Sequence, residues 1–209
     1  MEWSEKQLQI LEVAEELFAE KSYEGTSVRD IAQKAEVNIA MISYYFGSKE
    51  KLLEALIEYR ASYAAGVVDE LEKKGITDPQ RKMDRLIDFY VERILVNHRF
   101  HNIMSRQLSM ISEEKLRNKM IDIKQKNMEL VRKVILEGQR KKVFRKVDVD
   151  LTMATITGTI SQVTLAKGYY CKLMNAEDLE FSEYISKMKT RVKTHLKQLI
   201  GAHLDIKNA

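Results

Sequence analysis

The sequence predicts an all-α protein of about nine helices. Apolar residues recur at steps of three and four along most of the chain, which is the period of one helix face. The alternation of apolar and polar residues that marks a half-buried strand is nearly absent. The chain holds one proline and eight glycines, so its helices meet few residues that break them.

Composition is typical of a soluble globular protein, with 44% hydrophobic and 32% charged residues. A chain of 209 residues accommodates a small domain followed by a larger one, and we expect these at 1–47 and 48–209. The single cysteine excludes an internal disulfide framework and fits a reducing compartment. Acidic residues just after Met1 argue against a secretory signal peptide. We therefore expect a cytoplasmic protein.

Residues 25–49 predict two short helices joined by a tight turn. Thr26 or Ser27 is placed to cap the first helix, because a hydroxyl oxygen can accept a free N–H of its opening turn. The first helix carries one apolar face, and residues 36–37 form the turn. Asn38 is placed to cap the second helix. The pattern is that of a helix-turn-helix unit.

The second of these helices is expected to bury Ile42 and Phe46 and to end at Gly47. Its other face then presents small, hydroxyl and aromatic groups, which suits the major groove of DNA. The residues on that outer face are Ala40, Met41, Ser43 and Tyr44. A structural helical hairpin without DNA contact is the alternative.

About the first quarter of the chain resembles the N-terminal DNA-binding module of the tetracycline-repressor (TetR) family of bacterial transcription regulators. The matching residues are Phe18, Ala19, Gly25, Thr26, those from Val28 to Ala32, Val37, Tyr45, Phe46, Ser48, Lys49, Glu50 and Leu52. The rest of the chain resembles the family in length and helical layout. The resemblance implies a dimeric repressor that leaves double-stranded operator DNA when a small molecule enters the C-terminal domain.

Contacts with DNA follow from this resemblance together with side-chain chemistry. Apolar groups can meet thymine methyl groups, hydroxyl groups can bond phosphates, and an arginine can address guanine. Two positions depart from the family pattern, Met41 and Ser43, and Glu36 replaces the usual turn glycine. The predicted DNA-contacting set is Ser27, Arg29, Asn38, Ile39, Ala40, Met41, Ser43, Tyr44, Tyr45 and Lys49.

Charge does not favour DNA binding by itself. Residues 1–50 carry five Lys and Arg against ten Asp and Glu, although the whole chain has a net charge of +4. Phosphate contact must therefore come from a local patch and from helix N-termini. This acidity supports an alternative function, a helical ligand-binding or interaction protein that binds no operator.

The larger domain contains several methionines on successive predicted helices, and methionine adapts to irregular apolar ligands. Core packing is the commoner role for each of them singly. Guided by the resemblance, we expect a pocket for a small amphipathic or apolar effector. Its predicted lining is Tyr63, Phe89, Tyr90, Met104, Arg106 and Met128.

Residues 151–166 contain no charged side chain, so a helix there must be covered on most sides. The segment is too short and too polar to cross a bilayer, so no membrane partner is expected. With the last helix it predicts a four-helix homodimer interface; the alternative is the central helix of the monomer core. The predicted interface is Gly158, Ser161, Gln162, Ile185, Met188, Val192, His195 and Leu199.

No set of residues predicts catalysis, a cofactor or a metal site. His98 and His101 stand three apart, but no third ligand of suitable spacing follows, so the pair is not expected to bind metal. The basic residues of 140–146 are typical of a solvated loop, and a second DNA or anionic-ligand contact is the less favoured role. We therefore expect a binding protein rather than an enzyme.

Overall fold

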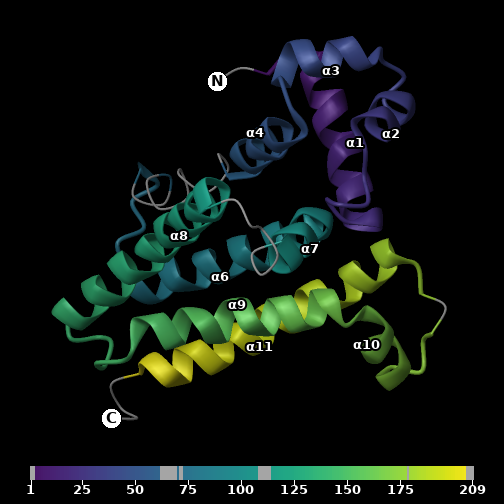
Figure 1. The fold of residues 1–209 in the computed structure, drawn as a ribbon. Helices are drawn as coiled ribbons and strands as arrows, with labels where there is room; N and C mark the ends of the chain where they lie inside the picture. The colour runs from purple at the N-terminus through teal and green to yellow at the C-terminus, as the bar shows by residue number, and fades with distance from the viewer. Residues whose placement is uncertain (1–2, 62–69, 71–72, 108–113, 178, 206–209) are drawn as a thin grey trace. The chain divides into compact units, whose positions relative to one another are not determined.

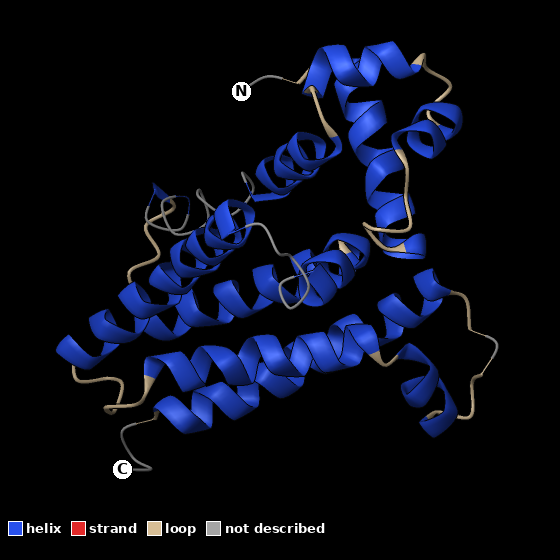
Figure 2. Cartoon of the chain, viewed as in Figure 1, coloured by secondary structure: helices blue, strands red, loops and turns tan. Residues whose placement is uncertain are grey.

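The computed structural model describes residues 3–61, 70, 73–107, 114–177 and 179–205. Within these ranges the chain forms ten helices and no strand, which confirms the predicted all-α class (Figures 1 and 2). The chain divides into two compact units. Unit 1 comprises residues 1–63 and 99–123, and unit 2 comprises 64–98 and 124–209.

Unit 1 is built from the first four helices and one helix from the middle of the chain. They are α1 (Glu5–Lys21), α2 (Val28–Lys34), α3 (Ile39–Phe46), α4 (Lys49–Ala61) and α7 (His98–Gln107), whose first residue belongs to unit 2. Residues 114–123, the beginning of a further helix, also belong to unit 1.

The core of unit 1 forms where α1 meets α2 and α4 and where α2 and α4 meet α3. Leu11, Ala14 and Phe18 of α1 are buried as their helical spacing predicts. Ile10 is fully buried as well. Ile103 of α7 joins the same core.

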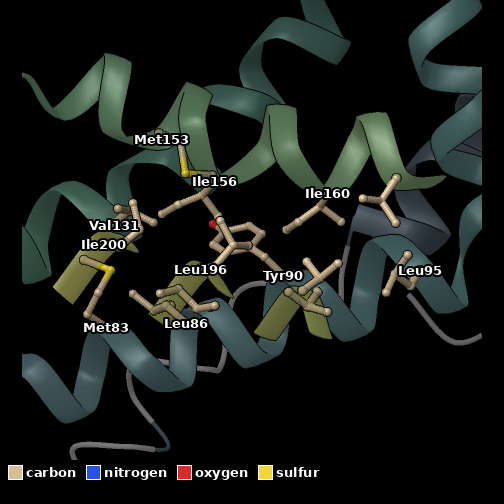
Figure 3. Packing of buried hydrophobic residues seen from close by; sticks show 14 of the residues in the cluster. Met83, Leu86, Tyr90, Leu95, Val131, Met153, Ile156, Ile160, Leu196 and Ile200 are labelled. Atoms are coloured by element: carbon tan, nitrogen blue, oxygen red, sulfur yellow. The ribbon is translucent and has the colours of Figure 1, made fainter. Parts of the chain in front are cut away.

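Unit 2 contains α6 (Pro79–Val96), most of α8 (Glu114–Arg140), α9 (Val149–Leu165), α10 (Lys167–Leu173) and α11 (Phe181–Leu204). Its core lies where α6, α9 and α11 pack together, as the labelled side chains of Figure 3 show. The helix predicted at residues 151–166 corresponds to α9, and the predicted last helix corresponds to α11.

Hydrogen-bonded ion pairs join α11 to α6 in unit 2. The Nζ of Lys193 donates to Glu92 at 2.6 Å, and the Nζ of Lys197 donates to Asp88 at 2.8 Å, so one flank of α11 is fixed on α6. Gly138 lies where α8 meets the following loop. A Cβ atom there would stand 2.0 Å from the Phe144 ring, so the close approach requires glycine.

The predicted boundary at residue 47 falls between α3 and α4, and α4 shares the core of unit 1. Its value as a functional boundary stays a prediction. No helix in the described ranges is long and apolar enough to cross a membrane.

Candidate DNA-binding surface

The first motif helix, α2, begins with a reciprocal cap. The backbone N–H of Asp30 donates to the Ser27 hydroxyl at 3.1 Å, and the N–H of Ser27 donates to the Asp30 carboxylate at 2.8 Å. Hydrogen bonds from Ser27 lower the pKa of Asp30. Thr26 is buried, and its hydroxyl donates to the carbonyl of Leu17. Of the two predicted caps, Ser27 is therefore the one used.

The turn between the motif helices contains a residue in the left-handed region. Glu36 has φ +51°, in the place where the family pattern has glycine. The N–H of Val37 then donates to the carbonyl of Ala32 at 3.0 Å and closes the turn. The Asn38 side-chain oxygen accepts the N–H of Ala40 at 2.9 Å, which confirms Asn38 as the cap of α3.

The two faces of α3 differ sharply in exposure. Ile42 and Phe46 are 1% and 7% exposed and pack in the core of unit 1. Tyr44 is 85% exposed and Ile39 is 42% exposed. Ala40 and Ser43 are exposed and Met41 is half-buried, so the predicted outer face of α3 is open to solvent within unit 1.

Aromatic side chains pack beside and beneath the exposed face of α3. Tyr45 is half-buried against the core, and its ring lies 5.3 Å from the Tyr44 ring in an edge-on arrangement. The ring of Trp3 stacks on Phe46 at 6.5 Å, so Trp3 holds the start of the chain against α3. These contacts lie on the core side of α3 and leave Tyr44 exposed.

Lys49 makes contacts that its place in the sequence does not predict. Its Nζ donates to the carbonyls of Tyr23 and Thr26 at 2.9 and 3.0 Å, and it lies 4.2 Å from the centre of the Tyr23 ring. The first residue of α4 is thereby tied to the loop between α1 and α2. The predicted phosphate contact of Lys49 stays a prediction. No sequence signal reveals such bonds, because both acceptors are backbone atoms.

Arg29 is exposed on α2, whereas acidic residues of α1 are engaged with cations of the same unit. Glu15 is 3% exposed and accepts the Nε of Arg60 at 2.8 Å. Glu16 lies 2.9 Å from Lys34 and 3.3 Å from Arg99, and its hydrogen bond with Lys34 lowers the pKa of Glu16. Part of the acidity of residues 1–50 is thus balanced inside unit 1.

The predicted effector-pocket residues fall in different places. Met104 is 8% exposed in the core of unit 1, whereas Tyr90 is 4% exposed in the core of unit 2. Burial raises the pKa of Tyr90 to about 12. Phe89 and Met128 pack against the core of unit 2. Tyr63 and the side chain of Arg106 lie outside the described part.

The predicted dimer residues also divide into two groups. Met188 and Val192 are each 4% exposed in the core of unit 2, so they offer almost no surface to a second chain. This corrects their expected place, because the apolar seam of α11 packs inside the monomer. The others are exposed or half-buried on α9 and α11, namely Gly158, Ser161, Gln162, Ile185, His195 and Leu199.

His98 and His101 each lie beside a residue of their own surroundings. The His98 ring lies 3.8 Å from the Phe181 ring, and His101 lies 3.5 Å from the Ser105 hydroxyl. Among the described residues no group of three or more His, Cys, Asp and Glu side chains is arranged to hold a metal ion.

The basic segment of residues 140–146 borders an open surface cleft of about 450 Å³ that includes Arg140 and Lys146.

Comparison with known proteins places this architecture in a family. A family model described as "Bacterial regulatory proteins, tetR family" matches residues 10–56. A second, described as "Tetracyclin repressor-like, C-terminal domain", matches residues 77–165. The first match contains the whole helix-turn-helix, from the start of α2 to the end of α3.

Among curated relatives, the probable HTH-type transcriptional regulator YttP of Bacillus subtilis is 31% identical over 137 residues. The match covers 65% of this chain and 65% of YttP, so the chain spans just under two thirds of that relative. The HTH-type transcriptional repressor NicS of Pseudomonas putida is 29% identical over 159 residues, covering 69% of this chain and 68% of NicS.

A solved structure shows the same fold. The regulator FadR of Bacillus subtilis in complex with stearoyl-CoA is 22% identical, with a TM-score of 0.69 over 94% of this chain and 98% of that chain. The helix-turn-helix geometry, the two matched models and the relatives agree. The chain therefore belongs to the tetR family of bacterial regulatory proteins.

Proposed function

We propose that this protein is a homodimeric transcriptional repressor that binds double-stranded operator DNA and leaves it when a small amphipathic or apolar effector binds. Membership of a family of bacterial regulators supports DNA binding, and the relative NicS is named a repressor. A regulator of this kind works on bacterial DNA, so the proposal places it in the cytoplasm.

One observation carries the proposal. The face of α3 opposite its packed side is open, and its centre is Tyr44, which is 85% exposed. A large aromatic residue at that exposure gains nothing from the core of unit 1. On the second helix of a helix-turn-helix unit, this face is the one that enters the major groove.

Selection of binding sites tests the proposal. The full chain is incubated with a random duplex library, and with DNA from upstream of its own gene, at a stated salt concentration. We expect a two-fold symmetric site whose half-sites lie about 34 Å apart, because a dimer places two recognition helices in successive major grooves. Failure to enrich any duplex would contradict operator binding.

Substitution of Tyr44 gives a sharper test. Tyr44→Ala should weaken operator binding by about tenfold or more, which is the scale of a good base contact. The fold should be unaffected, because Tyr44 is 85% exposed. Tyr169→Ala is the matched control, since Tyr169 is 60% exposed on α10 of unit 2. Anisotropy with the selected duplex measures both, and equal affinity of Tyr44→Ala and parent would remove Tyr44 from the contact set.

The proposed dimer interface is the outer face of α9 with the adjoining flank of α11. Leu151 and Leu165 of α9 are 67% and 48% exposed, and exposed Gly158 lies between them on an uncharged face. Leu199 of α11 is 40% exposed. The opposite flank of α11 is occupied by lysines paired with α6. An uncharged apolar face on two adjacent helices suits an isologous four-helix contact.

The proposed effector site lies in unit 2, around Phe89, Tyr90 and Met128. Aromatic rings and a flexible thioether suit an amphipathic molecule, and FadR, which has the same fold, is described in complex with stearoyl-CoA. An effector weakens operator binding only by its differential affinity for two states of the protein. Titration with long-chain acyl-CoA should lower operator affinity if this ligand class is right.

The alternative function is a helical ligand-binding protein that binds no operator. Its support is the excess of ten acidic over five basic residues in residues 1–50. Several of these acids are paired within unit 1, which weakens that support. The selection experiment separates the two functions, since the alternative predicts no enriched duplex.

A further inference from the structure

The side chains of α3 are Ile, Ala, Met, Ile, Ser, Tyr, Tyr and Phe, with no charged or amide group among them. Successive residues of a helix turn by about 100°, and Ile42 and Phe46 mark the packed side. Ala40, Met41 and Tyr44 therefore lie around the centre of the open side. In the opening turn, which approaches base edges in a helix-turn-helix, that side offers alkyl and thioether groups.

Bidentate or charged hydrogen-bond readout of bases needs groups that α3 does not carry. Guanine is addressed by Arg or Lys, adenine by Asn or Gln in bidentate fashion, and cytosine by Asp or Glu. Asn38, just before α3, has its side-chain oxygen engaged with the N–H of Ala40 at 2.9 Å. That bond competes with a bidentate contact to adenine. The exposed cation Arg29, on α2, is assigned to a phosphate.

The base-edge feature that matches alkyl groups is the C5 methyl of thymine. We infer that α3 selects its half-site by thymine methyl groups, read by Ala40 and Met41, so that A·T pairs occupy the positions beneath its first turn. This inference rests on the proposed function and names the class of operator. The hydroxyl group of Ser43 serves a phosphate, and Tyr44 contacts a base at the edge of the site.

Replacing thymine by deoxyuridine tests the inference, because the change removes the methyl group and keeps base pairing. The full chain is first used to select a duplex from a random library, and each thymine of one half-site is then replaced in turn. At two or three adjacent positions we expect affinity to fall about fourfold per replacement, the scale of one buried methyl group. Thymines elsewhere in the duplex should tolerate replacement.

A second series separates methyl recognition from a change in duplex shape. At a sensitive position, the A·T pair is replaced by G·C and by G with 5-methylcytosine. Methyl recognition predicts that the methylated pair binds about fourfold more tightly than the unmethylated one. Equal binding of the two pairs would contradict the inference.

Variants assign the contact to α3. Met41→Ala should abolish the deoxyuridine penalty at one position, whereas Arg29→Ala should weaken binding and leave the penalty unchanged. Melting curves confirm that both variants are folded. If no duplex is selected, the proposed function fails; if a duplex is selected and tolerates deoxyuridine throughout, only the present inference fails.

Discussion

At the scale of single residues, Glu36 stands in a backbone conformation that favours glycine. Its φ is +51°, and the side chain is exposed. A left-handed conformation costs a residue with a Cβ about 1–2 kcal/mol. Glycine avoids this strain, but its more flexible unfolded chain offsets part of the gain in stability. Glu36→Gly should therefore raise the free energy of unfolding by about 0.5–1 kcal/mol, as measured by denaturant titration.

The control for this prediction is Gly47, which has φ +81° after α3. Gly47→Ala places a Cβ on a residue that also has a positive φ and should lower the free energy of unfolding by about 1 kcal/mol. Loss of stability in Glu36→Gly would show that the glutamate side chain, rather than the backbone, dominates at this turn.

Residue-scale features were predictable where they depend on near neighbours in sequence. Ser27 and Asn38 cap their helices through atoms two or three residues away, so a sequence window contains both partners. The bonds of Lys49 reach carbonyls 26 and 23 residues earlier, and the accepting atoms occur in every residue. Sequence alone therefore could not predict the hydrogen bonds of Lys49.

At the scale of helices, Lys49 joins α4 to the loop before α2. Lys49→Gln should lower operator affinity by misplacing the motif, while the slope of log affinity against log salt stays unchanged. Direct phosphate contact instead predicts a slope reduced by about 0.9 for each subunit. Lys51→Gln, at an exposed position of the same helix, is the control. Anisotropy at several salt concentrations distinguishes the two roles.

The outer face of α9 yields a prediction about assembly. A Cβ at Gly158 would meet nothing within 4 Å, so the monomer has room for a larger side chain there. Gly158→Glu should give a folded monomer, because it buries a charge in the proposed interface. Lys187→Glu, exposed on α11, should stay dimeric. Sedimentation decides this, and a dimeric Gly158→Glu would move the interface elsewhere.

Helix α11 shows why element faces were only partly predictable. Spacing correctly identified Met188 and Val192 as an apolar seam, and the structure buries this seam within unit 2. A seam facing the monomer core and one facing a partner have the same period, because both exclude water. Leu151 and Leu165, which extend the exposed face of α9, were missed for the same reason.

At the scale of the whole molecule, the residues predicted to line the effector pocket belong to two different cores. Met104 belongs to the core of unit 1, and Tyr90 belongs to the core of unit 2. Both are apolar helix positions, and no local pattern states which core each will join. The division depends on long-range packing, with α7 joining the N-terminal helices from a distant part of the chain.

Charge across the molecule leads to a prediction about salt. The motif helices α2 and α3 carry two cations, Arg29 and Lys34, and Lys34 lies 2.9 Å from Glu16. We therefore expect each subunit to neutralise only one or two phosphates. Each neutralised phosphate contributes about 0.9 to the slope of log affinity against log salt. A dimer should then show a slope between about −2 and −4.

Anisotropy titrations of the selected duplex between about 50 and 200 mM salt measure this slope. Arg29→Ala should reduce its magnitude by about 2 in the dimer, one unit for each subunit. Lys34→Ala should change it little, because its ammonium already faces Glu16. A slope steeper than about −6 would mean that further cations reach the phosphates. In that case the acidity of residues 1–50 would not limit the contact with DNA, and affinity would rest on charge more than on the apolar face of α3.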